Sequence, residues 1–452
     1  MKRLIYFVLF GLVILSSCKK DWLDAKPTKS LVVPETINDY QLLLNNRSIF
    51  GTGYPSQTEL ANGDGYVTYA TFLADPPNSR FAYIWDQDNY KDQYIPDWIF
   101  QYQKILGANV VLDGLEKLSP TSIEQIEWNS VRGQALFFRA FTFYCLTQTF
   151  CKPYEESTAM TDLGLPLKLS PEVDQIVKRS TLKETYDRII ADLNESYLLL
   201  PINQQYKTQP TKNAVMALLA RIYLSMKKYS QALDMAEKSL AMNTKLIDYN
   251  SLDNSAAYPF PLFNDEVIWH AELANNFSLA NRNGVITDEL FNLYEIDDLR
   301  KTLFFQANGP DSRRFIGNYS GVKGPLFNGL ANDELYLILA ECKVRSNRIQ
   351  EGMDDLNALM ETRYKTSTYH DQTAANETTA LRIILTERRK QLLFRNIRWS
   401  DLRRLNSDQR FAVTLSRTLN GVTYTLPPND SRYTFFIPTQ EILLSGIEQN
   451  PK

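Results

Sequence analysis

The chain has 452 residues, 44% hydrophobic and 22% charged, as expected of a globular protein with one large domain or two to three smaller ones. A formal charge of -3 argues against a protein that binds nucleic acid by neutralising phosphates. The two histidines, His270 and His370, are far apart in sequence, which argues against a histidine-based metal cluster, and we expect no cofactor.

The N-terminus has the pattern of a secretory signal. Two basic residues precede an apolar run over residues 4–15, which is too short to span a bilayer as a helix. The ending Leu15 to Cys18 resembles a bacterial lipobox, whose cysteine is acylated. We therefore expect a signal peptide over residues 1–17, a lipid on Cys18 and a tether over residues 18–30 that holds the protein at a membrane surface. The alternative is an ordinary signal peptide with a chance cysteine.

Two segments of the remaining chain, residues 50–96 and 250–330, combine many glycines and prolines with many aromatic residues. Neither segment has a clear helical or strand period, so we predict loop-rich regions with a few short strands, for instance at Val267 to Ala271. Long loops of this kind in a compact protein are usually functional.

Helical patterns dominate elsewhere. Residues 134–149 are apolar nearly all round, which predicts a helix buried by neighbours on several sides. Thr181 and Glu184 have capping-box spacing at the start of an amphipathic segment that Pro201 cannot continue, which predicts a helix over about 182–199.

One hairpin pattern occurs twice. Met216, Leu219, Ala220 and Tyr223 precede Ala232 and Ala236, and Tyr336, Leu339 and Ala340 precede Gly352 and Leu356. This spacing matches a tetratricopeptide unit, in which small residues let antiparallel helices approach closely, although a plain helical hairpin is the alternative. We predict a mainly α fold, a tetratricopeptide-like superhelix with helix pairs around residues 97–150, 181–243 and 332–363.

Two other sets of residues have predicted internal roles. Cys145, Cys151 and Cys342 show no CxxC spacing and are expected to be buried free thiols. The basic residues Arg388, Arg389, Lys390, Arg395, Arg398, Arg403 and Arg404 form a run near the C-terminus. We expect internal ion pairs, or arginines packed on Trp399, rather than a nucleic-acid site.

Several motifs in a fixed order resemble the SusD/RagB family of surface lipoproteins. They are Trp98, Tyr102, Ile105 and Asn109; Gly133 to Phe141; Arg179 to Pro201; Glu387 to Arg404 with its Arg-Trp-Ser-Asp-Leu-Arg-Arg core; and Ile437 to Pro451 with its closing Gln-Asn-Pro. The resemblance covers nearly the whole mature chain. Two positions depart from the family pattern, since Cys151 and Asn396 stand where the family usually has glycine.

The resemblance implies a single SusD-like domain over residues 31–452 with a loop-rich ligand-binding face. It further implies a lipid-anchored protein, exposed on the outer membrane, that captures a nutrient oligosaccharide and delivers it to a SusC-like TonB-dependent transporter without catalysis. Family members that bind oligopeptides are one alternative. A secreted glycosidase and a tetratricopeptide adaptor are others, although no carboxylate pair stands out for the former.

Aromatic side chains in the loop-rich segments are the candidate ligand contacts, because flat rings stack on the apolar faces of sugars while polar side chains bind the hydroxyls. The candidates are Tyr66, Tyr69, Tyr83, Trp85, Asn276, Phe277, Arg282 and Tyr319. For any one of them, packing in the core is the alternative role.

Overall fold

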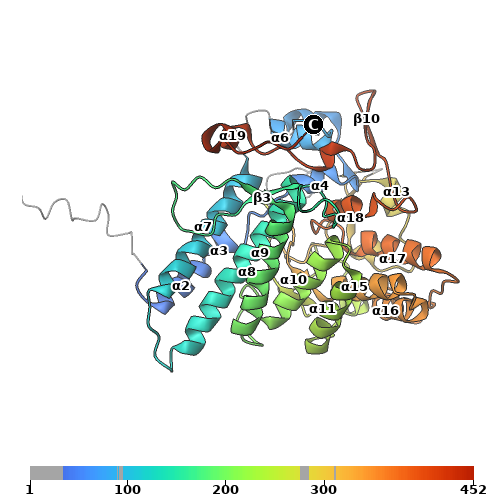
Figure 1. Cartoon of the computed structure of the whole chain (residues 1–452). Helices are drawn as coiled ribbons and strands as arrows, with labels where there is room; N and C mark the ends of the chain where they lie inside the picture. The colour runs from blue at the N-terminus through green and yellow to red at the C-terminus, as the bar shows by residue number, and fades with distance from the viewer. Residues whose placement is uncertain (1–33, 89, 91–94, 275–284, 310–311, 452) are drawn as a thin grey trace, which may run out of the picture.

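A computed structural model describes residues 34–451 except 89, 91–94, 275–284 and 310–311 (Figure 1). The expected lipidation site Cys18 therefore lies outside the described residues. The longer helices are α2 (Ile37–Leu44), α7 (Pro96–Glu116), α8 (Gln125–Phe150), α9 (Leu182–Leu199), α10 (Lys212–Ser225), α11 (Tyr229–Met242), α15 (Asn332–Arg345), α16 (Ile349–Glu361), α17 (Glu377–Gln391) and α18 (Arg398–Leu405). None of the described helices has both the length and the apolar character needed to cross a bilayer.

Short helices and antiparallel strand pairs occupy the segments between the long helices. The short helices are α3 (Arg47–Phe50), α4 (Gln57–Ala61), α5 (Tyr69–Ala74), α6 (Pro77–Tyr83), α13 (Asp288–Phe291), α14 (Arg300–Leu303) and α19 (Thr439–Ser445), with single 3-10 turns η2 (Tyr249–Ser251) and η3 (Ser431–Tyr433). The strand pairs are β1 (Gly65–Tyr66) with β5 (Val285–Ile286), β2 (Leu163–Pro166) with β3 (Arg179–Thr181), β4 (Val267–Trp269) with β8 (Leu330–Ala331), β6 (Phe305–Ala307) with β7 (Arg313–Phe315), and β9 (Leu415–Leu419) with β10 (Val422–Leu426). The fold is mainly helical with short strand pairs, as the sequence predicts.

The long helices stand side by side in chain order, from α2 through α7 to α11 and on to α15 and α16, and α4, α6, α19 and the β9–β10 hairpin lie above them in Figure 1. Helix α8 is central, and every residue from Gly133 to Thr147 is buried. This confirms the predicted core helix. The larger of two hydrophobic clusters extends from Ile37 to Ile447 and includes residues of both the long helices and the short elements, and a second cluster lies among α15, α16 and α17.

The predicted cap of α9 is present. The Thr181 hydroxyl accepts a hydrogen bond from the Glu184 amide at 3.1 Å, and the Glu184 carboxylate accepts one from the Thr181 amide at 2.8 Å. This reciprocal pairing satisfies two amides that a helix start leaves free. The helix ends at Leu199, two residues before Pro201, as predicted.

The two predicted hairpins, α10–α11 and α15–α16, have loops of the same geometry. Each loop has three residues, and the middle residue is left-handed, with φ of 59° at Lys227 and 62° at Asn347. In both loops the third residue donates its amide proton to a carbonyl five residues back, Lys228 to Tyr223 and Arg348 to Lys343. This common helix-ending geometry identifies the two hairpins as the same structural unit.

Gly352 lies where α16 crosses α15. A Cβ atom there would lie 2.6 Å from the Ala340 carbonyl oxygen and 2.6 Å from Val344 Cγ2. Glycine therefore allows the close approach that the spacing of the small residues predicts.

Gly352→Ala is expected to lower the free energy of unfolding by about 1–3 kcal/mol, because overpacking outweighs the better helix propensity of alanine. Denaturant unfolding measures the effect. Gln350→Ala, on the exposed face of the same helix, is the control and should change stability by less than about 0.5 kcal/mol. Equal stability of the glycine and alanine proteins would contradict the close approach.

The loop-rich prediction for residues 50–96 and 250–330 is only partly right. A strand does form at β4, within the predicted range, but the first segment also contains α4, α5 and α6. These helices are at most seven residues long and show no readable period. Asn396, which replaces a family glycine, has a φ of 59°, a left-handed conformation that asparagine tolerates.

The three described cysteines are buried free thiols, as predicted. Burial raises the pKa of Cys145 to about 12 and that of Cys151 to about 11. These thiols are therefore protonated and unreactive at neutral pH.

Candidate functional site

The structure separates the candidate ligand contacts into three groups. Tyr66 and Tyr69 are exposed, with 40% and 42% of their surface accessible. Three others are buried: Tyr83, Trp85 and Tyr319. The remaining candidates, Asn276, Phe277 and Arg282, lie outside the described residues.

Strand β1 and helix α5 together present the two exposed tyrosines. Tyr66 pairs with Val285 of β5, and the next residue, Val67, turns into the core. Thr68 then caps α5 by accepting a hydrogen bond from the Thr71 amide at 3.2 Å, which places Tyr69 in the first turn of the helix. The cap and the strand pairing therefore fix the backbone from which both tyrosines project.

Helix α5 places an apolar surface beside these tyrosines. None of its residues is buried, and Leu73 is 52% exposed. The Tyr69 ring lies nearly parallel to that of Phe72, with 6.4 Å between ring centroids, and Phe72 packs on Tyr83 at 6.0 Å. Large contiguous apolar patches on a protein surface often mark binding sites. We define Tyr66, Tyr69, Phe72 and Leu73 as the tyrosine surface.

Tyr83 packs against Phe72 of this surface, and both Tyr83 and Trp85 are buried, which corrects their prediction as accessible contacts. The Arg417 guanidinium lies over both rings, 4.0 Å from the Tyr83 centroid and 4.8 Å from that of Trp85. The Tyr83 hydroxyl accepts a hydrogen bond from the Val67 amide at 3.1 Å, and Trp85 Nε1 donates to the Ala61 carbonyl at 2.9 Å. Burial lowers the pKa of Arg417 to about 10, so the residue stays charged at neutral pH.

Tyr319 is also a core residue rather than a surface contact. Its hydroxyl donates to Glu266 at 2.7 Å, and the Arg395 guanidinium lies 3.9 Å from its ring centroid. Aromatic side chains of the loop-rich segments thus fill the core beneath the short elements as well as forming the surface.

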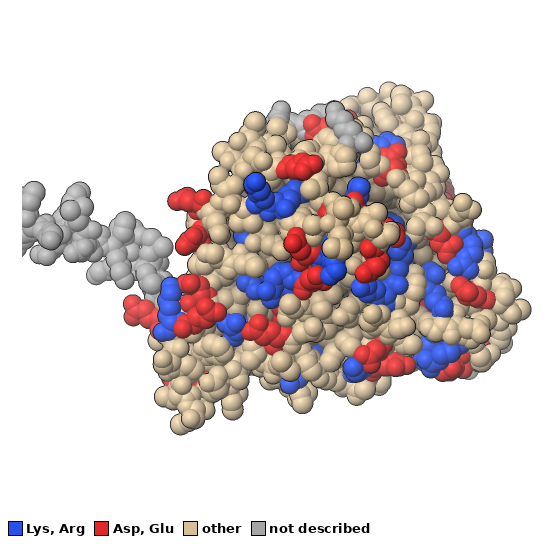
Figure 2. Space-filling model, in the orientation of Figure 1, with Lys and Arg blue, Asp and Glu red and all other residues tan. Residues whose placement is uncertain are grey.

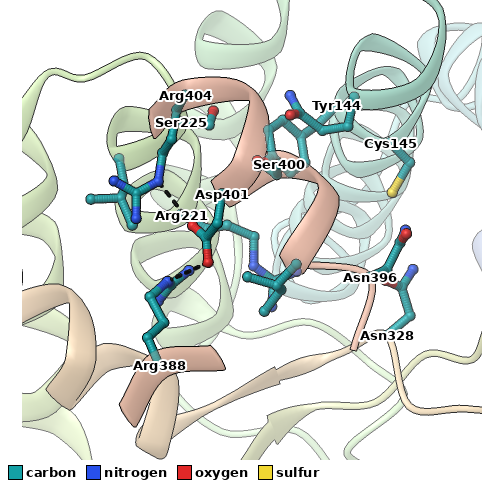
Figure 3. A pocket seen from close by; sticks show the side chains of 13 residues that line it. Tyr144, Cys145, Arg221, Ser225, Asn328, Arg388, Asn396, Ser400, Asp401 and Arg404 are labelled. Carbon is teal, nitrogen blue, oxygen red and sulfur yellow. Dashed lines mark hydrogen bonds and ion pairs between the residues drawn. The ribbon is translucent and has the colours of Figure 1, made fainter. Parts of the chain in front are cut away.

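Most of the basic run near the C-terminus forms internal ion pairs, as predicted, whereas Arg403 donates to the backbone carbonyls of Gln148 and Cys151. Arg388 and Arg404 reach Asp401 from two sides, at 2.8 and 2.9 Å (Figure 3). Other members pair with acids from distant segments: Arg389 with Asp64, Lys390 with Asp298 and Arg395 with Asp333. Because these charges are paired inside the protein, they do not form an anion-binding surface.

A small cavity lies inside this ion-pair network, between α8, α10 and α18 (Figure 3). Its volume of about 20 Å³ matches a single water molecule. Polar side chains line it, including Ser400, Asn328 and Asn396. The cavity is therefore part of the packed interior and too small for an oligomeric ligand.

Two buried acids have pKa values near neutrality. Burial raises the pKa of Glu59 to about 8 and that of Asp97 to about 6. The Asp97 carboxylate accepts hydrogen bonds from the Ser56 and Gln57 amides at 3.1 and 3.0 Å. Both side chains are almost fully buried, so they stabilise backbone turns and do not face a substrate.

Figure 2 shows acidic and basic side chains interspersed over one face of the molecule. Many of the exposed charges form pairs, such as Lys183 with Asp187 at 2.6 Å. On the face shown in Figure 2, charges of one sign do not gather into a patch that would attract a strongly charged ligand.

Comparison with known proteins identifies the family. A family model described as starch-binding, associating with outer membrane, matches residues 21–224, and a SusD family model matches residues 333–451. A SusD-like protein P2 of Formosa agariphila is 36% identical over 110 residues, which span 24% of this chain and 20% of that relative's length. The chain belongs to the SusD/RagB family, a family of binding proteins associated with the outer membrane.

Solved structures show the same fold. A SusD superfamily protein from Bacteroides vulgatus has a TM-score of 0.76 at 20% identity, covering 92% of this chain and 99% of that one. Surface glycan-binding protein A from Bacteroides fluxus has a TM-score of 0.69 at 14% identity, covering 92% and 100%. The predicted SusD-like fold is thus confirmed.

Proposed function

We propose that this protein is a lipid-anchored surface protein that captures a nutrient oligosaccharide on the tyrosine surface and passes it to a SusC-like TonB-dependent transporter. The observation that carries the proposal is the exposure of Tyr66 and Tyr69 beside a strand pair and a helix cap, in a chain of the SusD/RagB family. A tyrosine side chain has only two χ angles, so each ring loses little conformational freedom when it stacks on a sugar ring.

The proposed role is capture without turnover. The buried acids with raised pKa, Glu59 and Asp97, are inaccessible, which favours binding over glycoside hydrolysis. An oligopeptide in place of the oligosaccharide would use the same surface, because aromatic rings also pack on peptide side chains.

Replacing both tyrosines tests the proposal. After a glycan and peptide array has identified a ligand, Tyr66→Ala with Tyr69→Ala should weaken its binding about thirtyfold, or about 2 kcal/mol, by removing two stacking contacts. Isothermal titration calorimetry measures the loss. Tyr206→Ala is the matched control, because Tyr206 is 54% exposed and outside the tyrosine surface, and it should leave the dissociation constant unchanged. Equal affinity of the double variant and the wild type would reject this surface.

Anchoring and partnership need their own measurements. Mass spectrometry of the native protein should find an acylated N-terminal Cys18, and affinity purification from detergent-solubilised outer membranes should recover a TonB-dependent barrel. An unacylated N-terminus would contradict the anchor. Recovery of a different partner protein would favour the adaptor function, and turnover of an oligosaccharide would favour the glycosidase.

A further inference from the structure

Arg417 of strand β9 is a buried cation without an ion-pair partner among the described residues. It is only 8% exposed, and its Nε and Nη2 atoms have no hydrogen-bond partner among those residues. Asp64, the carboxylate whose charge acts on it, is paired with Arg389 at 2.7 Å instead. A buried charge without a counter-charge lowers stability, and an apolar residue often fits such a position better. Stability alone therefore does not account for an arginine here.

The contacts that Arg417 does make are with two buried aromatic residues. Its Nη1 donates a hydrogen bond to the Tyr83 carbonyl at 2.6 Å. The guanidinium lies 4.0 Å from the centroid of the Tyr83 ring and 4.8 Å from that of Trp85, and cation–π attraction of this kind is strongest where water is excluded. One side chain thus holds the backbone and ring of Tyr83 together with the ring of Trp85.

The turn that follows α6 depends on support from other segments. Trp85 has a φ of 55°, a left-handed conformation that is rare for a bulky residue and persists only where the surroundings enforce it. Two arginines from the C-terminal part of the chain contact Trp85. Arg417 lies over its ring, and Arg432 donates from Nη1 to its carbonyl at 3.2 Å. The backbone at the end of α6 is therefore fixed by residues that are distant in sequence.

Tyr83 contacts the tyrosine surface at two points. Its hydroxyl accepts a hydrogen bond from the amide of Val67, which lies between the two exposed tyrosines, at 3.1 Å. Its ring packs on Phe72 with 6.0 Å between centroids, and Phe72 stacks on Tyr69 at 6.4 Å. A displacement of Tyr83 would therefore move both the backbone that joins the two exposed tyrosines and the ring that supports the second.

We propose that Tyr83 and Arg417 are positioning residues of the tyrosine surface. Arg417 fixes Tyr83, and Tyr83 fixes the placement of Tyr66 and Tyr69 relative to each other. Both positioning residues are buried, so they act through the exposed tyrosines and not by contact with a ligand. The inference rests on the proposed function, because the relative placement of two rings matters where one ligand contacts both, and such contacts must be held by surrounding packing and hydrogen bonds.

Fluorine NMR of the full chain, without any ligand, tests this placement. 3-Fluorotyrosine is introduced singly at position 66, 69 or 206, the last being an exposed control outside the tyrosine surface. Tyr83→Phe keeps the ring and removes only the hydroxyl that accepts from Val67. It should shift the resonances at positions 66 and 69 by more than a linewidth and leave the resonance at position 206 unchanged. Unchanged resonances at both positions of the surface would overturn the role of Tyr83.

Arg417→Leu and Arg417→Lys test the cation in the same way. Leucine should shift the resonances at positions 66 and 69, while the denaturant midpoint changes little, because removal of a buried unpaired charge offsets the lost hydrogen bond. Lysine keeps a positive charge near the rings and should give resonances closer to those of the wild type. A lower midpoint with no shift at either position would identify Arg417 as an ordinary core residue and overturn the proposal. Equal shifts from leucine and lysine would overturn the role of the charge.

Failure of the proposed function appears separately. If Tyr66→Ala with Tyr69→Ala leaves ligand binding unchanged in calorimetry, the tyrosine surface is not the binding site, even where the NMR shifts show that it is held in place. If the double variant loses binding but the resonances do not respond to Tyr83→Phe or Arg417→Leu, the binding site is correct and the positioning role is wrong.

Discussion

Glu341→Gln is expected to lower the free energy of unfolding by about 3–5 kcal/mol. The Glu341 carboxylate is fully buried on α15 and accepts two hydrogen bonds from Arg404, at 2.6 and 2.7 Å, and one from Arg345 at 2.8 Å. Glutamine keeps the shape but leaves two largely buried guanidinium groups without this counter-charge. Denaturant unfolding measures the loss as a lower midpoint with an unchanged slope.

The matched control is Glu351→Gln on the next helix. Glu351 forms an exposed pair with Arg348 at 2.6 Å, and exposed pairs contribute less than about 1 kcal/mol. If both glutamine variants were equally stable, the internal ion-pair network would not have the stabilising role assigned to it.

The pH dependence of stability tests the role of Glu341 in a second way. Burial alone would raise the pKa of Glu341, but Arg404 and Arg345 lower it from 4.5 to about 2. The ionised carboxylate therefore stabilises the fold fully above about pH 4.5, and this contribution, about 3 kcal/mol, is lost as the pH falls toward 2. The wild type should lose stability over this range more steeply than Glu341→Gln.

Trp269→Ala is expected to cost about 3–5 kcal/mol, because it leaves a large cavity between β4 and α8. The indole is fully buried, with ring centroids 4.9 Å from Phe137 and 4.7 Å from Phe141, and its Nε1 donates to the Thr208 carbonyl at 3.0 Å. This side chain attaches strand β4 to helix α8. Thermal and denaturant unfolding measure the effect.

Trp128→Ala provides the comparison for Trp269. Trp128 is half-buried near the start of α8, and its Nε1 donates to the Leu115 carbonyl at 3.0 Å. Its loss should cost less than about 2 kcal/mol, because water reaches the site after truncation. If Trp128→Ala lowered the free energy of unfolding more than Trp269→Ala, the central position of Trp269 in the core would be contradicted.

The sequence by itself identified the elements whose signals are local. The cap formed by Thr181 and Glu184, the all-round apolar run of α8 and the small residues of the two hairpins are readable because each acts within one helix or between neighbouring helices. The internal pairing of the basic run followed from charge and composition. Most of the family motifs likewise lie along single helices, α7, α8, α9, α17 and α18.

Only the tertiary structure decided which aromatic side chains face solvent. Tyr66, Tyr69, Tyr83 and Trp85 share one glycine- and proline-rich segment, yet Arg417 from the distant β9 strand covers the last two and leaves the first two exposed. The short helices α4 to α6 also could not be predicted from the sequence, because helices of fewer than two turns form only when other segments pack on them. The pocket lined by residues 152–162, 403–406 and 429–451 likewise exists only because three distant segments meet. Local sequence determines backbone elements through nearest-neighbour forces, whereas exposure and concavity depend on contacts between residues far apart in the chain.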